Sequence, residues 1–237
     1  MTEPPTVHLV GAGPGDPQLL TRRAARLLRS AEVVVADRRA TDAVLALAPA
    51  TAQVHDVGGT ADAPAWSLGR VVDLLAAPAV AGHRVVRLES GDPFVSSHAA
   101  AEVSALEAQG VTVTFTPGVS SATVAPLTAG MVPVAGSTVT IASGAAGAAE
   151  PPVDWSAFAE PGATLVVLMA PAGHGDLAPR LVSAGVSDST PVAVVYAAGR
   201  PGTQITHTDL AGLSDTHLPS PTTLVVGPMR RGARLPP

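Results

Sequence analysis

Short apolar runs alternate with longer amphipathic segments through the first half of the chain. The short runs are rich in β-branched residues, which predicts strands, while the longer segments repeat apolar residues at helical spacing. The predicted strands are 7–10, 32–37, 52–57, 83–90 and 111–118. The predicted helices are 16–31, 40–48, 67–81, 96–110 and 120–130. This alternation predicts an α/β fold with a mostly parallel sheet.

The alternation of predicted strands and helices changes near Met131, where the segment 131–137 has the composition of a hinge. The Gly- and Ala-rich stretch 144–152 is typical of a loop. Apolar segments lie at 138–143, 164–170 and 190–199. A helix is predicted at 175–185 and a late strand at 222–227. We therefore predict two α/β domains, 1–133 and 134–237.

Composition narrows the classes of function. The 237 residues are 46% hydrophobic and 14% charged, with a net charge of -5, which suits a compact protein with much buried sheet. All 14 basic residues are arginine and aromatic residues make up 3%, so we expect no nucleic-acid partner. No apolar run reaches the roughly 20 residues that span a bilayer. We expect a cytoplasmic protein without a membrane partner. The chain has no cysteine, and its seven histidines are too scattered to predict a metal site.

The stretch VGAGPGD at 10–16 joins a predicted strand to a predicted helix, as nucleotide-binding loops do. Gly11 and Gly13 fit the dinucleotide fingerprint, and Asp37 ends the second strand where a ribose-binding acid would stand. Asp16 occupies the place of the third glycine, where its carboxylate would repel a pyrophosphate. Asp16 has an alternative role as a cap that accepts N–H groups of the first turn. An NAD-dependent oxidoreductase is therefore one alternative function.

A second strand–turn–helix segment, VVRLESGDPFV at 85–95, matches the first in layout. These two segments, with AEVVVADR at 31–38 and TPGVSSATVAPLTAGMVPV at 116–134, resemble the tetrapyrrole methylase family, the class III S-adenosylmethionine-dependent methyltransferases. Further matches at TLVVLMA, TPVAVVYAAGRPGTQ and PTTLVVG extend the resemblance over nearly the whole chain. The resemblance implies two α/β domains with the cofactor in the cleft between them, and a homodimer.

The resemblance also implies S-adenosylmethionine as the cofactor and a set of residues that contact it. Carried onto the matching positions, these are Pro14, Ser90, Gly91, Asp92, Val95, Ser120, Ser121, Met169 and Ala198. The cofactor carries no phosphate, so Asp16 does not count against it, and its positive charges favour an acceptor such as Asp92. Structural alternatives stand beside these roles. They are a helix cap for Asp92, N-caps for Ser120 and Ser121, and core packing for Met169.

Departures from the family pattern bear on the substrate. A family lysine that is proposed as a proton donor falls at Gly59, a family arginine falls at His98, and a His-Arg pair is lost within 133–137. Each lost cation removes a charge-assisted contact to a carboxylate, which favours a less anionic substrate. Of the retained arginines, Arg87 falls inside or beside a predicted strand. We take Arg38 and His98 as candidate substrate contacts, although His98 could instead be an exposed helix residue.

The sequence thus predicts an S-adenosylmethionine-dependent C-methyltransferase that acts on a ring carbon of an electron-rich nitrogen heteroaromatic. Asp37 is the candidate catalytic base or acceptor for a ring N–H, and its alternatives are an ion pair with Arg38 or Arg39, or a helix cap. The lost cations favour a small indole or pyrrole, as in secondary metabolism. The alternative, which the family implies as the default, is methylation of uroporphyrinogen III to precorrin-2. A relative that binds the cofactor without turnover is a further alternative.

Overall fold

The structure is a computed structural model. It describes residues 4–37, 40–58, 65–95, 99–133, 138–144, 154–159, 162–170, 177–216, 221–227 and 229–231. The chain divides into two compact units, Met1–Ser120 and Ser121–Pro237. The division falls before the predicted boundary at residue 133, because helix α5 (Ser121–Thr128) packs on the sheet of the second unit.

The first unit is built on a five-stranded sheet with the order β3-β2-β4-β1-β5, in which every pair is parallel, as predicted. The strands are β1 (Thr6–Gly11), β2 (Val33–Ala36), β3 (Gln53–Asp56), β4 (Val85–Glu89) and β5 (Thr112–Thr116). The inner strands β2 and β4 are buried along their whole length, whereas most residues of the edge strands β3 and β5 are exposed or partly exposed. A parallel sheet that is covered on both faces requires this distribution.

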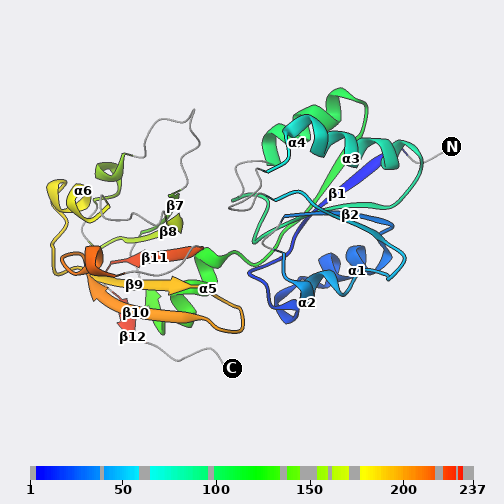
Figure 1. Cartoon of the computed structure of the whole chain (residues 1–237). Helices are drawn as coiled ribbons and strands as arrows, with labels where there is room; N and C mark the ends of the chain where they lie inside the picture. The colour runs from blue at the N-terminus through cyan, green and yellow to red at the C-terminus, as the bar shows by residue number, and fades with distance from the viewer. Residues whose placement is uncertain are drawn as a thin grey trace. The chain divides into compact units, whose positions relative to one another are not determined.

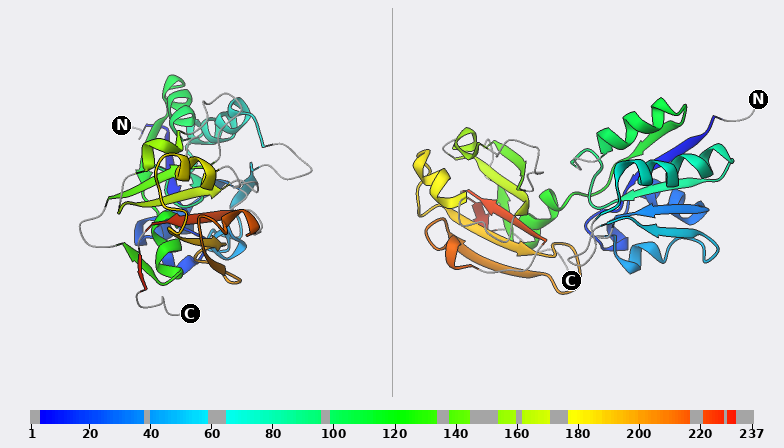
Figure 2. Two further views of the ribbon diagram at one scale, coloured as in Figure 1. Left: turned by 90° about the vertical axis from the view of Figure 1, so that its left-hand side faces the viewer. Right: turned by 45° about the horizontal axis from the view of Figure 1, so that its top comes forward.

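Helices cover both faces of this sheet, with α1 and α2 on one face and α3 and α4 on the other (Figures 1 and 2). Their bounds are α1 (Arg22–Ser30), α2 (Asp42–Leu45), α3 (Leu68–Val80) and α4 (Ala99–Ala108). The predicted helix 16–31 is interrupted. It consists of the short 3₁₀ helix η1 (Pro17–Leu19) and of α1, because Thr21 caps a new helix by accepting the N–H of Ala24.

The second unit has a five-stranded sheet with the order β10-β9-β11-β8-β7. Its strands are β7 (Val139–Ser143), β8 (Thr164–Ala170), β9 (Pro191–Tyr196), β10 (Gln204–Asp209) and β11 (Thr222–Val226). Only β7 and β8 pair in parallel, and the other three pairs are antiparallel. The mostly parallel arrangement predicted from the first half of the chain does not extend to this unit, since β9 and β10 pair as a hairpin that is joined by residues 197–203 without a crossover helix.

Helix α6 (Leu177–Ser183) packs on one face of the second sheet, and α5 contacts β8, β9 and β11. The remaining described elements are β6 (Met131–Pro133), β12 (Met229–Arg231) and the 3₁₀ helices η2 (Trp155–Phe158) and η4 (Leu213–Asp215). The start of the predicted hinge 131–137 is strand β6, which pairs with β12 near the end of the chain. Within the described residues, no helix is long and apolar enough to cross a membrane.

Candidate functional site

Three loops meet at the carboxyl end of the first sheet, and glycines allow them to touch. A Cβ placed on Gly11 would lie 2.5 Å from the backbone nitrogen of Gly118 and 2.7 Å from the carbonyl oxygen of Gly91. Gly91 and Gly13 exchange two backbone hydrogen bonds, of 2.8 and 3.1 Å, and both have a positive φ, near 70°. The loops after β1, β4 and β5 are thus joined backbone to backbone, through a close approach at Gly11 and a positive φ at Gly13 and Gly91.

Asp92 fastens the second of these loops to the third. Its Oδ1 accepts the N–H of Phe94 at 2.8 Å, and its Oδ2 accepts the N–H of Gly118 at 2.9 Å. Asp92 therefore caps no helix within the described residues: its side chain forms a turn within its own loop and ties that loop to the one after β5. The cofactor contact implied by the resemblance stays a prediction for this residue.

Hydrogen bonds of Asp16 and Thr41 hold the loop after β1 in its conformation. The Oδ1 of Asp16 accepts the N–H of Gln18 at 2.8 Å, and Pro17 begins η1. The capping role predicted for Asp16 is confirmed. Because its carboxylate already occupies this helical end, the loop lacks the open N-terminus that binds a pyrophosphate. The Oγ1 of Thr41 donates to the carbonyl oxygen of Gly15 at 2.6 Å and holds the loop against α2.

The alternation of side chains along β4 places two charged residues on the face of the sheet that α3 and α4 cover. Val86 and Leu88 point to the core under α1 and α2, so Val85, Arg87 and Glu89 point to the opposite face. Helix α4 lies on that face and buries one stripe, of which Glu102 is a member. Arg87 and Glu102 meet there inside the protein.

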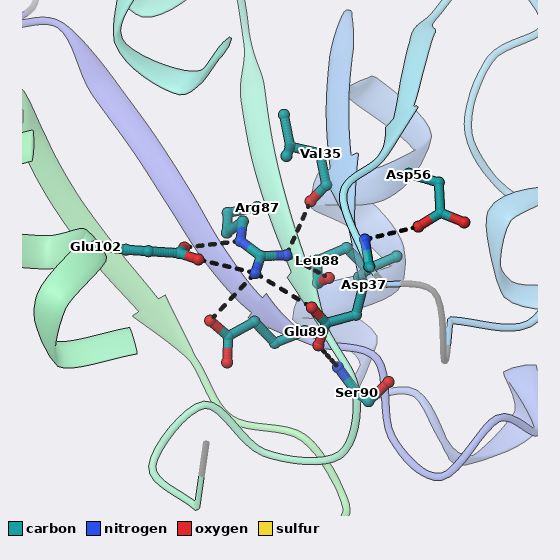
Figure 3. A network of polar contacts seen from close by, with 9 residues as sticks. Val35, Asp37, Asp56, Arg87, Leu88, Glu89, Ser90 and Glu102 are labelled. Atoms are coloured by element: carbon teal, nitrogen blue, oxygen red, sulfur yellow. Dashed lines mark hydrogen bonds and ion pairs between the residues drawn. The ribbon is translucent and has the colours of Figure 1, made fainter. Parts of the chain in front are cut away.

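A network of ionic contacts surrounds Arg87 (Figure 3). Its Nε and Nη2 donate to the two carboxylate oxygens of Glu102 at 2.7 and 2.9 Å. Nη2 also donates to Oδ1 of Asp37 at 3.2 Å and lies 3.9 Å from Oε1 of Glu89. Nη1 donates to the backbone carbonyl oxygens of Val35 and Leu88.

Burial by itself would lower the pKa of the Arg87 guanidinium. The hydrogen bonds to Glu102 and the charges of Asp37, Glu102 and Glu89 outweigh this effect, and the pKa is raised above its usual value. Arg87 therefore stays charged. Its donors are directed at protein acceptors, so it is not a cation that faces a substrate.

Asp37 is held from two sides at the end of β2. Arg87 binds Oδ1, and the backbone N–H of Ser90 donates to Oδ2 at 3.2 Å. An ion pair was the predicted alternative for Asp37, and within the described residues its partner is Arg87. Arg38 and Arg39 lie outside those residues. The Asp37 side chain is 32% exposed, compared with 4% for Arg87, so the carboxylate retains access to a ligand.

The other predicted contacts of the first unit, Pro14, Ser90, Val95 and Ser120, lie in the segments that follow β1, β4 and β5, whereas Ser121 is the first residue of the second unit. Pro14 is buried and Val95 is partly buried. The hydroxyl of Ser90 is buried and, within the described part of the chain, has no hydrogen-bond partner. Such an unsatisfied polar atom fits a site that a ligand completes. Ser120 immediately precedes α5 and Ser121 begins it, which leaves their alternative role as helix caps open.

In the second unit, Met169 and Ala198 stand at the ends of β8 and β9. Met169 has φ 51°, and the register between β8 and β11 shifts beside it. Ala197, next to Ala198, also has φ 51°. Both strand ends flank Thr222 of β11, which pairs with Ala170 on one side and with Tyr196 on the other. Backbone held in this region by residues other than glycine costs about 1 kcal/mol or more, and such strain gathers at functional sites.

Several predicted residues cannot be placed. Arg38, Gly59 and His98 lie outside the described residues. Among the residues that are described, no group of three His, Asp or Glu side chains could hold a metal ion. Glu102 and Glu89 were not predicted as site residues. The signal for them was Arg87 itself, since a charge within an apolar strand requires a buried counter-charge.

Comparison with known proteins agrees with this geometry. Residues 6–214 match the family of Tetrapyrrole (Corrin/Porphyrin) Methylases. The chain is 35% identical over 229 residues to a uroporphyrinogen-III C-methyltransferase of Synechococcus elongatus, covering 95% of this chain and 93% of that protein. A protein of the same name from Paracoccus denitrificans is 34% identical, with 93% and 80% covered. The match to the siroheme synthase of Ruthia magnifica covers 48% of that longer protein.

Solved structures share the fold. The uroporphyrin-III C-methyl transferase of Thermus thermophilus, complexed with S-adenyl homocysteine, superposes with a TM-score of 0.80 at 34% identity, covering 94% of this chain and 92% of that one. The predicted α/β fold with two sheets is thereby confirmed, and the resemblance seen in the motifs is confirmed by the family match. The chain belongs to the tetrapyrrole methylase family and is an S-adenosylmethionine-dependent C-methyltransferase.

Proposed function

We propose that this enzyme methylates ring carbons of uroporphyrinogen III, giving precorrin-2. The observation that carries the proposal is the similarity, over nearly the full length of both chains, to the protein of that name from Synechococcus elongatus, at 35% identity over 229 residues. The Paracoccus denitrificans protein supports it in the same way over 229 residues. A match confined to one unit would support the fold and the cofactor without supporting the acceptor.

The comparisons favour this acceptor over the small indole or pyrrole that the lost cations suggest. The relatives described above are named for uroporphyrinogen or for siroheme synthesis, and none of them is named for an indole. The loss of a lysine at Gly59 and of an arginine at His98 remains a fact of the sequence. Because these cations are lost, and because Arg87 is engaged within the protein and cannot replace them, we infer that the acceptor's carboxylates are bound with fewer cations than the family pattern provides.

Residues of the chain have separate tasks in this function. When bound, S-adenosylmethionine supplies an electrophilic methyl group whose positive charge passes to the acceptor ring on transfer. Asp37 accepts a hydrogen bond from the ring N–H and stabilises that charge, because it is a partly exposed carboxylate at the end of β2. For the cofactor we propose contacts from among those that the family resemblance implies, including Ser90, Asp92, Met169 and Ala198.

Mass spectrometry of methyl transfer tests the proposal. The wild-type protein is incubated with S-adenosylmethionine and either uroporphyrinogen III or a panel of indoles and pyrroles. A mass gain of one or two methyl groups on uroporphyrinogen III supports the proposed acceptor. Transfer to an indole alone refutes it in favour of a repurposed site. Tight binding of S-adenosylhomocysteine without transfer to any acceptor indicates a relative that has lost turnover.

A variant separates chemistry from binding. Asp37→Asn keeps the size of the side chain but removes its charge, so we expect turnover to fall about 100-fold. The affinity for S-adenosylhomocysteine, measured by calorimetry, should change little. Equal turnover in the variant would make Asp37 a structural residue.

A further inference from the structure

We propose that Glu102 and Arg87 are positioning residues that act through Asp37. Neither touches a ligand in this scheme. The pair fixes the direction in which the Asp37 carboxylate is presented at the end of β2. The inference rests on the proposed function, because it assigns Asp37 the contact with the acceptor ring.

The geometry of the contacts makes Glu102 the anchor. Its two oxygens receive Nε and Nη2 of Arg87 at 2.7 and 2.9 Å, which fixes the plane of the guanidinium. The same Nη2 donates to Oδ1 of Asp37 at 3.2 Å. Because one nitrogen serves both carboxylates, the position of Glu102 on α4 determines where the donor to Asp37 lies. The backbone N–H of Ser90 holds the other Asp37 oxygen at 3.2 Å and completes the restraint.

The side chains of the network differ in their exposure to solvent. The side chains of Arg87, Glu89 and Glu102 are 4%, 0% and 5% exposed, whereas that of Asp37 is 32% exposed. Asp37 is therefore the member of this group that a ligand can reach. Figure 3 shows Glu102 and Asp37 on opposite sides of the guanidinium. The buried members connect helix α4 to this one accessible carboxylate.

A contribution to stability is a weak explanation of the network. A buried ion pair loses the hydration of both partners, and replacing one by well-packed apolar residues is often neutral or stabilising. Glu102 lies in the stripe of α4 that also buries Ala99 and Leu106, where an apolar residue would fit the pattern. Arg87 stands in a strand whose neighbours Val86 and Leu88 are buried apolar residues. Charged side chains at both places indicate a role for their direction and charge.

The charges also suit the reaction. Three carboxylates, those of Asp37, Glu89 and Glu102, surround one guanidinium. When the ring carbon forms its bond to the methyl group, the electron pair of the broken C–S bond stays on sulfur and the positive charge moves to the ring nitrogen. The ring nitrogen then gives its proton to the Asp37 carboxylate that accepts its hydrogen bond, and the ring regains neutrality. A carboxylate held in place before this charge develops stabilises it without reorganisation.

Double-mutant kinetics test the inference. Methyl transfer to uroporphyrinogen III is measured for the wild type, Glu102→Gln, Asp37→Asn and the double variant. We expect Glu102→Gln to lower kcat about 10-fold, because misplacing a reacting group by a fraction of an ångström already slows catalysis, with the affinity for S-adenosylhomocysteine changed by less than about 3-fold. The double variant should be no slower than Asp37→Asn, because Glu102 has nothing left to position. Glu107→Gln is the matched control, since Glu107 is an exposed carboxylate on the same helix.

A readout without turnover separates this inference from the proposed function. In carbon-13-labelled protein, Glu102→Gln should shift the side-chain carboxyl resonance of Asp37, and Glu107→Gln should not. If wild type transfers no methyl group to uroporphyrinogen III, the proposed function fails and the resonance decides the positioning role. Rate losses that multiply in the double variant, or an unmoved Asp37 resonance in Glu102→Gln, overturn the inference. Unfolding measured on each variant shows whether a rate loss is a loss of folded protein.

Discussion

Gly11→Ala tests whether the three loops at the carboxyl end of the first sheet form one packed junction. The new Cβ would lie 2.5 Å and 2.6 Å from backbone atoms of Gly118 and 2.7 Å from the carbonyl oxygen of Gly91. Carbon atoms pack best at about 3.5–4.0 Å, so the loops would have to separate by about 1 Å. The neighbours are backbone atoms that cannot rotate away. We therefore expect the upper end of the usual overpacking cost, about 3 kcal/mol of folding free energy.

Urea unfolding measures this cost. Trp66 packs on the core of the first unit and Trp155 on that of the second, so a Trp155→Phe background makes tryptophan fluorescence report on the first unit alone. With an m-value of about 2 kcal/mol/M, 3 kcal/mol lowers the midpoint by about 1.5 M. The affinity for S-adenosylhomocysteine should fall as well, because the loops that carry its predicted contacts move.

A matched glycine provides the control. Gly69 lies near the start of α3, and a Cβ added there would meet no atom within 4 Å, so Gly69→Ala should stabilise the unit by about 0.5 kcal/mol. A Gly11→Ala protein as stable as the wild type would refute the packed junction. So would an equal loss of stability in both variants.

Three further predictions concern single residues. Burial, with the charge of Arg23, lowers the pKa of His8 below its usual 6.5, so as the pH falls the unfolded chain is protonated before the folded one. The free energy of unfolding should therefore be full above pH 6.5 and fall below it. His8→Gln should flatten this pH dependence, which urea unfolding at several pH values measures. Asp92→Ala removes two hydrogen bonds to a charged acceptor, which should cost about 3 kcal/mol of stability and weaken S-adenosylhomocysteine binding at least 10-fold in calorimetry, whereas unchanged affinity would leave Asp92 a loop fastener. Met169→Gly relieves about 1 kcal/mol of backbone strain, which offsets the loss of the partly buried side chain, so stability should stay within about 1 kcal/mol of wild type. The affinity for the cofactor should fall because the predicted contact is lost, and an unchanged affinity would argue against that contact.

Local patterns predicted the first unit well, because its elements follow from short-range signals. The apolar runs gave β1, β2 and β4, and Asp16 followed by Pro17 gave a cap at the right place. The break after Leu20 was missed. Thr21 caps α1 from within a segment whose leucines keep helical spacing, so periodicity alone continued the helix.

The second unit shows what short-range patterns leave open. Strand direction depends on which segments pair, and β11 lies between β8 and β9 although it comes last among them in the chain. Pairing of β6 with β12 joins segments almost 100 residues apart, so residues 131–133 looked like part of a hinge. Positive φ at Met169 and Ala197 likewise has no signal in residue types that normally avoid it.

The network around Arg87 was only half visible in the sequence. A charged residue between Val86 and Leu88 requires a partner. The partner, Glu102, lies 15 residues later on a helix whose position on the sheet depends on tertiary packing. The sequence identified Asp37 from its place at a strand end. It offered Arg38 and Arg39 as ion-pair partners because they are adjacent in the chain, while parallel pairing of β2 with β4 brings in Arg87.

The most direct test of the account is to locate the transferred methyl group. The protein is incubated with S-adenosylmethionine that carries carbon-13 in its methyl group, together with uroporphyrinogen III, and the product is examined by carbon-13 NMR and mass spectrometry. C-methylation of uroporphyrinogen III predicts labelled methyl groups bonded to saturated ring carbons, in a product heavier by one or two methyl groups. Label that remains on the cofactor, or that appears as an ester on the side-chain carboxylates, would contradict C-methylation of this acceptor.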